Sequence, residues 1–208
     1  MNRQDALVIV EEYVKNQNLI NHMLCVEAAM RFYAEKLDQT LGRPSSGFGN
    51  LRVRKPQDIE LWGMTGLLHD FDWEIHPTLA EHPMAGLPIL RQRGVPEEIV
   101  HAILTHADHT ETPRVTPMEK ALFACDEVTG LITAVALVRP SRSLYDLTSS
   151  SVKKKWKDRA FAAGANREEI AAAANEFGVE LWQHVDNVIL AMRRIAPQIG
   201  LEGSLSPA

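Results

Sequence analysis

The sequence has few cysteines, and its first residues do not resemble a leader; both features bear on where we expect the protein to act. Its two cysteines, Cys25 and Cys125, each lie inside an apolar segment. This placement is typical of small buried residues in a reducing compartment and excludes a disulfide framework. The N-terminal residues lack a basic leader followed by a signal-type apolar core, so they predict no secretion signal. We therefore expect a cytoplasmic protein.

An excess of positive charge is also missing. The chain has 22 Lys and Arg against 27 Asp and Glu, which gives a formal net charge of −5. A protein that binds nucleic acid nonspecifically needs a basic surface, because it must neutralise phosphates. The composition therefore predicts that no nucleic-acid polymer is a partner.

No long apolar run is free of charge. Residues 121–138, ALFACDEVTGLITAVALV, approach the length that crosses a bilayer. They include Asp126 and Glu127, however, and ionised carboxylates are costly inside lipid. The segment therefore predicts a buried helix of a soluble protein and no membrane span.

The sequence shows no β-alternation and no internal repeat, whereas helical spacing of apolar residues occurs almost throughout, as at Leu7, Val10 and Val14. Its 208 residues suit one domain with a substantial core. We predict an all-α bundle in which 1–208 form a single domain. The expected helices, after one at the N-terminus, cover about 19–37, 57–69, 83–94, 95–107, 116–139, 149–162, 166–177 and 180–197.

Local signals mark several of these boundaries. Thr116, Pro117 and Glu119 form a capping-box pattern with proline at the first helical position. Asn166 is a predicted N-cap and Gly178 a predicted stop. Residues 40–56 are rich in Gly, Pro and Ser and include Arg52, Arg54 and Lys55. They predict a long irregular loop, a type that often has a function.

Titratable residues lie on the apolar sides of four predicted helices. In chain order they are His22, the pair His69–Asp70, His106 and Asp126. An ionised carboxylate in apolar surroundings is costly unless it is paired or bound to a metal. Imidazoles and carboxylates that converge from several helices form the sites that divalent metals occupy in bundle cores.

An isolated histidine, a His-Asp dipeptide and a distal aspartate, all on helices, resemble the HD superfamily of metal-dependent phosphohydrolases. The segment HPMAGLPIL from His82 resembles the H-P-x-x-G-x-x-I-L segment of members with two metals. The segments AILTHADH and ALFACDEVTGLI resemble the following histidine helix and the terminal aspartate helix. The resemblance covers 18–140, the predicted HD core, and leaves 141–208 as a C-terminal helical extension.

The resemblance implies a ligand set and a reaction. One divalent metal would bind His22, His69, Asp70 and Asp126. A second would bind His82 and His106, with Asp70 bridging the two. Nitrogen and oxygen ligands do not distinguish Mn, Fe, Zn, Mg, Ni and Co. Metal-activated water would attack phosphorus, and Asp70 would be the bridge and a candidate proton acceptor.

One position departs from the family pattern. Many two-metal members continue H-D-x-x-K, and that lysine contacts substrate phosphate, but here the position is Trp73. Asp72 and Glu74 stand nearby, and we expect them at the mouth of a pocket, with Asp72 as a second catalytic candidate. Arg139 and Lys154, the latter in a basic cluster over 153–159, are candidate substitutes that bind substrate phosphate. The G-Y-P motif of the cyclic-dinucleotide branch is absent after His106.

Three functions remain open at this stage. The first is hydrolysis of a nucleotide or other small phosphate ester. The second is a di-iron oxygenase that cleaves a small organic substrate, because some HD proteins with six ligands carry out this chemistry. The third is a metal-bound nucleotide sensor without turnover. We expect His76 and His109 in surface loops, His101 at a rim and His184 at the edge of the last helix.

Overall fold

The computed structural model describes residues 1–40 and 56–205, and these residues form helices and no strand. The expected loop over 40–56 lies outside the described residues, except for its two end positions. The elements in chain order are α1 (Arg3–Tyr13), α2 (Gln17–Thr40), α3 (Pro56–Leu68), α4 (Leu87–Gln92), α5 (Glu97–Thr105), the 3₁₀ helix η1 (Asp108–Thr110), α6 (Pro117–Leu137), α7 (Ser149–Trp156), α8 (Arg167–Phe177) and α9 (Leu181–Arg193).

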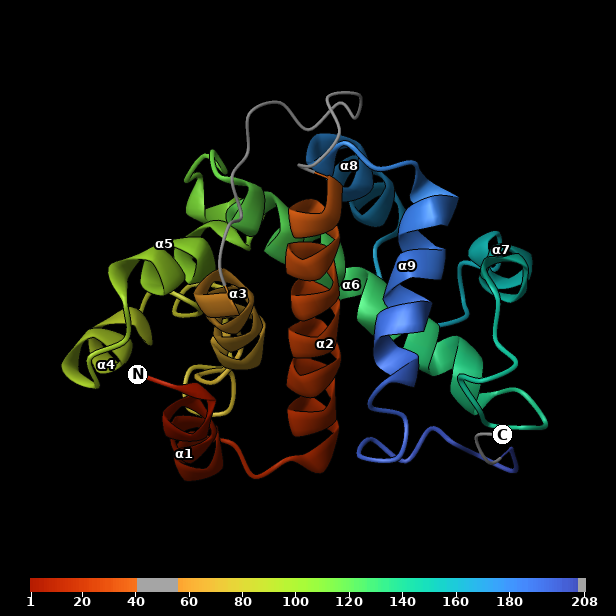
Figure 1. The fold of residues 1–208 in the computed structure, drawn as a ribbon, viewed down its shortest axis with the longest axis horizontal. Coiled ribbons are helices and arrows are strands. Elements are labelled where there is room, and N and C mark those ends of the chain that lie inside the picture. The colour runs from red at the N-terminus through yellow and green to blue at the C-terminus, as the bar shows by residue number, and fades with distance from the viewer. Residues whose placement is uncertain (41–55, 206–208) are drawn as a thin grey trace.

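Helix α2 stands at the centre of the bundle. Figure 1 shows α1, α3, α4 and α5 on one side of it and α7 and α9 on the other, while α6 crosses behind it. Helix α2 contacts α3, α6 and α9, and α6 contacts α7, α8 and α9 as well. The helices of the predicted extension therefore pack directly onto the predicted core. The predicted all-α bundle is confirmed; the boundary at residue 140 stays a prediction.

Two clusters of buried apolar side chains fill the bundle. One joins α2, α6, α8 and α9 and includes Val26, Leu122 and Val188. The other joins α1, α3, α4 and α5 to the start of α2 and includes Ile9 and Leu68. Helices α2 and α3 run between the two clusters. Polar side chains on the turns where these two helices face each other therefore lie inside the bundle.

Several local signals are confirmed, and two helix boundaries are not. The Thr116 side chain accepts from Glu119 N, and Gly178 ends α8 with a left-handed backbone at φ +80°. Helix α7 ends at Trp156 and α4 begins at Leu87, so both are shorter than predicted. After α7, the buried guanidinium of Arg167 donates to the backbone carbonyls of Phe161, Ala162 and Ala165. Carbonyls bonded to that side chain are not available for helical hydrogen bonds.

The apolar stretch over 121–138 forms most of α6, and its inner face is buried, including Leu122, Leu131 and Ile132. Within 1–40 and 56–205, no helix has both the length and the hydropathy that a bilayer crossing requires. The prediction of a buried helix at this position is confirmed.

Candidate metal centre

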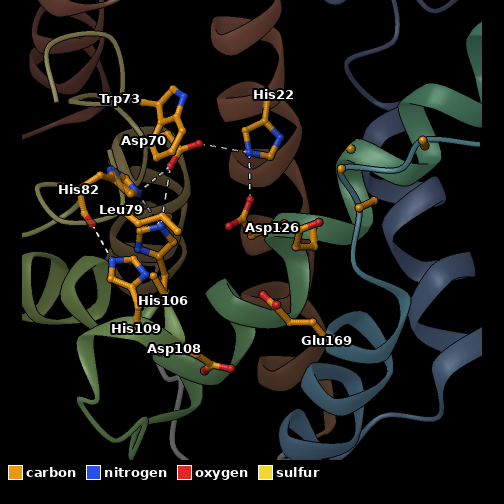
Figure 2. Close-up of a pocket in the computed structure, with 16 residues that line it drawn as sticks. His22, Asp70, Trp73, Leu79, His82, His106, Asp108, His109, Asp126 and Glu169 are labelled. Atoms are coloured by element: carbon orange, nitrogen blue, oxygen red, sulfur yellow. Dashed lines mark hydrogen bonds and ion pairs between the residues drawn. The ribbon is translucent and has the colours of Figure 1, made fainter. Parts of the chain in front are cut away.

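The structure brings all six predicted metal ligands together. His22 lies in the second turn of α2, and His69 and Asp70 follow the last residue of α3. His82 lies in the turns before α4, His106 caps the C-terminus of α5, and Asp126 belongs to α6. Figure 2 shows five of these side chains converging on one space from separate elements. Residues that are up to about a hundred positions apart in the chain therefore share one site.

The first ligand group consists of His22, His69 and Asp126, which offer atoms within 4.8 Å of one another. His22 Nε2 lies 2.9 Å from Asp126 Oδ1 and 3.2 Å from His69 Nε2. His69 Nε2 lies 3.4 Å from Asp126 Oδ1. Two imidazoles and a carboxylate at these separations can bind one divalent cation.

The second ligand group consists of Asp70, His82 and His106. His82 Nε2 lies 3.2 Å from His106 Nε2 and 3.3 Å from Asp70 Oδ1. Asp70 Oδ2 lies on the other side, 3.4 Å from His69 Nε2 and 3.6 Å from His22 Nε2. Asp70 thus presents one carboxylate oxygen to each group, which is the arrangement of a bridging ligand.

The second ring nitrogen of each histidine is held by an acceptor. His69 Nδ1 lies 2.8 Å from the carbonyl of Gly66, and His106 Nδ1 lies 2.5 Å from that of Ile103. A carbonyl can only accept, so both Nδ1 atoms carry the proton. His82 Nδ1 faces the Asp72 carboxylate at 2.9 Å. His22 Nδ1 lies 3.2 Å from the Thr129 hydroxyl, whose own proton goes to the Asp126 carbonyl.

With Nδ1 protonated in this way, the Nε2 atom of each histidine in its neutral form directs a lone pair at the two groups. Lone pairs and carboxylate oxygens that face one another at about 3 Å repel unless a cation or a proton lies between them. Second-sphere acceptors on Nδ1 are also the usual partners of metal-binding histidines. The described residues therefore fit two divalent cations.

The electrostatics of the cluster favour positive charge at its centre. Burial lowers the pKa of His69, but the carboxylates of Asp70 and Asp126 raise it by more, so the net pKa is well above the ordinary value. Burial opposes ionisation of Asp126, yet His69 and His22 hold its pKa well below the usual range. The pKa of His106 is lowered by burial and by His69. Bound metals would provide the charge that protons otherwise supply.

Asp72 is fully buried, which makes the expected position at a pocket mouth wrong. Its Oδ1 accepts from His82, and its Oδ2 has no partner among the described residues. A Cβ atom on Gly86 would lie 2.5 Å from that Oδ2, so the glycine leaves room for the carboxylate. Glu74 is also displaced from the expected place, because it accepts from the backbone N–H groups of Lys15 and Asn16. Because Asp72 is buried against His82, its carboxylate cannot contact a substrate in the pocket.

A pocket of about 670 Å³ opens above the ligands, a size typical of small-molecule sites. Trp73 and Leu79 form part of its wall, and Trp73 packs edge-on against His82 with 4.9 Å between ring centroids. The opposite wall comes from α6 and from the segment 162–169 before and within α8. The predicted extension therefore does fold over the site, although not through its basic cluster.

His109 lines the pocket as well, a role that no local sequence pattern indicates. Its Nε2 donates to the His82 carbonyl at 2.8 Å (Figure 2). His109 is exposed in the short 3₁₀ helix η1, which agrees with the expected surface position. The contact exists because η1 follows α5 directly and returns the chain to the turn that carries His82.

Arg139 and Lys154 do not reach the pocket, and their expected contact with substrate phosphate is wrong for this structure. Arg139 pairs with Asp146 and donates to Ser151 Oγ at 3.0 Å. It follows α6, thirteen residues after Asp126, so a straight helix puts the two about 20 Å apart. Lys154 is exposed on α7.

Two acids that the sequence analysis did not select, Glu127 and Glu169, line the pocket beyond the ligand groups. Burial raises the pKa of Glu127 to about 7, with the neighbouring carboxylates of Asp126 and Glu169 adding to the effect. Glu169 lies in the first turn of α8, where an acid is expected for helix stability alone. Sequence patterns therefore carried no signal that it faces the site.

The HD domain family model matches residues 19–131, which is more than half of the chain and includes all six predicted ligand residues. A search of curated proteins and a search of solved structures each gave no match.

Proposed function

Because this chain belongs to the HD domain family, we propose that it is a metal-dependent phosphohydrolase that acts on a nucleotide or other small phosphate ester. The observation that carries the proposal is the position of Asp70. One of its oxygens lies 3.4 Å from His69 Nε2 and the other 3.3 Å from His82 Nε2. A carboxylate shared in this way supports a two-metal site of the kind that cleaves phosphate esters.

The six ligands would divide between two cations. His22, His69 and Asp126 would hold one, His82 and His106 would hold the other, and Asp70 would contribute to both. When bound, divalent cations lower the pKa of a coordinated water and neutralise charge on phosphoryl oxygens. In the overall reaction, a water oxygen bonds to phosphorus, the ester P–O bond breaks, and the alcohol leaves with a proton.

The residues of the chain prepare this site in two ways. Acceptors at Nδ1 fix the four histidines in the tautomer whose Nε2 is free to bind. The buried position of His69 and His106 keeps bulk water from one side of the ligands, while the pocket admits substrate from the other. Both effects reduce reorganisation of the site when substrate binds.

The test is hydrolysis of a panel of phosphate monoesters, nucleoside monophosphates included, by protein loaded with Mn²⁺, Fe²⁺ or Mg²⁺. We expect phosphate release that Asp70→Ala reduces by at least about a thousandfold, because both metals lose a ligand. His101→Ala is the matched control, since His101 pairs with Glu119 outside the pocket. Phosphatase activity that survives in Asp70→Ala would overturn the proposal.

Two further assays on the same metal-loaded protein test the oxygenase and the sensor alternatives. An oxygen-uptake assay with the Fe²⁺ form would reveal a di-iron oxygenase, because a hydrolase consumes no oxygen. Nucleotide binding in calorimetry without turnover of any panel member would indicate a sensor.

A further inference from the structure

The described wall of the pocket contains histidines but no lysine or arginine. Among the residues that the structure describes, five carboxylates line it. Asp70 and Asp126 belong to the ligand groups. Asp108 pairs with Arg114, whose Nη2 lies 2.7 Å from Asp108 Oδ1 and which also pairs with Glu176. Neither Glu127 nor Glu169 forms an ion pair with a lysine, arginine or histidine among the described residues.

Glu127 and Glu169 lie close together because both contact Asn166. Glu127 Oε2 lies 3.4 Å from Asn166 N, and Glu169 Oε2 lies 3.4 Å from Asn166 Nδ2. These hydrogen bonds are long, and neither acid forms an ion pair with any described residue. Figure 2 shows the Glu169 side chain extending from α8 toward the ligand cluster. Both carboxylates can therefore accept hydrogen bonds from a ligand in the pocket.

The metal ligands and the acidic wall formed by Glu127 and Glu169 favour opposite charges on a molecule bound in the pocket. The two bound cations would attract the phosphoryl group, while Glu127 and Glu169 would repel any further anion nearby. Resting on the phosphohydrolase function proposed above, we propose that the substrate is a phosphate monoester whose organic part carries an ammonium group, which binds between Glu127 and Glu169.

The wall also has room for such a group. Gly130, Gly164 and Ala165 lie beside the two acids, and a Cβ atom on either glycine would meet nothing within 4 Å. An ammonium group offers three donors, enough for both carboxylates at once. Burial and the nearby carboxylates of Asp108 and Asp126 raise the pKa of Glu169, a sign that like charges are crowded there. Nucleoside di- and triphosphates would place additional anionic groups against this wall and are disfavoured.

Binding of three phosphonates of matched size to the Mn²⁺-loaded protein tests the inference without turnover. The probes are 2-aminoethyl-, propyl- and 2-carboxyethylphosphonate, which have no ester oxygen to cleave. We expect the dissociation constant, measured by calorimetry, to be lowest for the amine and highest for the carboxylate, with about a tenfold difference at each step.

Glutamine variants of the two wall acids test whether these acids cause the preference for the amine. We expect Glu127→Gln and Glu169→Gln each to reduce the ratio of amine to propyl affinity to about threefold or less. Glu168→Gln is the matched control, because Glu168 is the neighbouring acid on α8, pairs with Arg159 and does not line the pocket. It should keep the full preference. Equal affinities for the three probes, or an unchanged preference in both wall variants, would overturn the inference.

Turnover of the corresponding phosphate esters, 2-aminoethyl, propyl and 2-carboxyethyl phosphate, separates the two proposals. Preferred hydrolysis of the amine supports both. Hydrolysis of all three at equal kcat/KM retains the phosphohydrolase function and overturns the amine preference. The predicted order of phosphonate binding without hydrolysis of any ester overturns the phosphohydrolase function and supports the charge preference of the pocket.

Discussion

Asp72 accepts the Nδ1 proton of His82 at 2.9 Å, and no part of Asp72 reaches solvent. The contact fixes which ring nitrogen of His82 is protonated. It leaves Nε2 as the free nitrogen, 3.2 Å from His106 Nε2 and 3.3 Å from Asp70 Oδ1. A carboxylate that orients a ligand histidine increases its basicity and holds its ring in place.

Replacing Asp72 should therefore weaken the second metal site selectively. We expect Asp72→Ala to reduce affinity at the site of His82 and His106 by about 10- to 100-fold, while the site of His22 and His69 changes little. Metal titration followed by elemental analysis would count the cations per chain. Asp72→Asn keeps an acceptor for Nδ1 and should restore part of the affinity.

The control for this change is Glu81→Gln, which alters an exposed acid next to His82 that bonds Thr78 instead. It should retain both metal sites. Two metals bound with undiminished affinity in Asp72→Ala would show that Asp72 does not orient His82.

Gly86 supports the same contact by its lack of a side chain. A Cβ atom there would lie 2.5 Å from Asp72 Oδ2 and 2.6 Å from Cγ. We expect Gly86→Ala to displace the carboxylate, to destabilise the protein by about 1–3 kcal/mol and to weaken the second metal site. A double-mutant cycle provides the check, because Asp72→Ala removes both of these atoms. The added cost of Gly86→Ala should then fall; an unchanged cost would place the strain elsewhere.

His69, Asp70 and His82 are predicted as ligands from the resemblance to the HD superfamily, whereas helical spacing alone predicts that His22, His106 and Asp126 lie on apolar helix faces. His22 three residues after Leu19 and His106 three after Ile103 are examples. The positions of Asp72 and Gly86 could not be predicted in this way, since the chain between Leu68 and Leu87 forms turns without a repeating period.

The walls of the pocket depend on tertiary packing that no local pattern reports. Glu169 has the ordinary placement of an acid in a first helical turn, and only the packing of α8 on α6 directs it to the site. At Lys154, by contrast, a local pattern predicted a contact that the structure lacks. A cluster of basic residues suggested a phosphate contact, yet α7 packs against α6 and α9 and leaves this lysine exposed.

Metal binding should stabilise the fold. The converging lone pairs and carboxylates repel one another without a cation, and a ligand that binds only the folded state adds about 4 kcal/mol when present at a thousand times its dissociation constant. We expect added Mn²⁺ to raise the Tm of chelator-treated protein. Asp70→Ala should lose most of this shift, whereas His101→Ala should keep it. An equal shift in all three proteins would mean that the cation binds elsewhere.

A buried histidine outside the pocket, His184, links α9 to the core and should affect stability differently. His184 Nε2 donates to the Ala124 carbonyl at 2.7 Å, and its Nδ1 accepts from the Tyr33 hydroxyl at 2.6 Å. Asn187 donates in turn to the Tyr33 oxygen. Both ring nitrogens are thus occupied in the neutral form, and the side chain is fully buried, so the expected place at the edge of the last helix is wrong.

Burial lowers the pKa of His184 from 6.5 to about 4 in the folded protein. Between these two values the unfolded chain holds a proton on His184 that the folded chain lacks, so stability falls as pH decreases. From pH 7.5 to 5.0 this residue should remove about 2 kcal/mol of the free energy of unfolding. Urea denaturation with chelator present, in wild type and in His184→Gln, would measure it. Groups other than His184 titrate in both proteins and affect the two stabilities alike. Between pH 7.5 and 5.0 the wild type should therefore lose more stability than the variant, and equal losses would contradict the assignment.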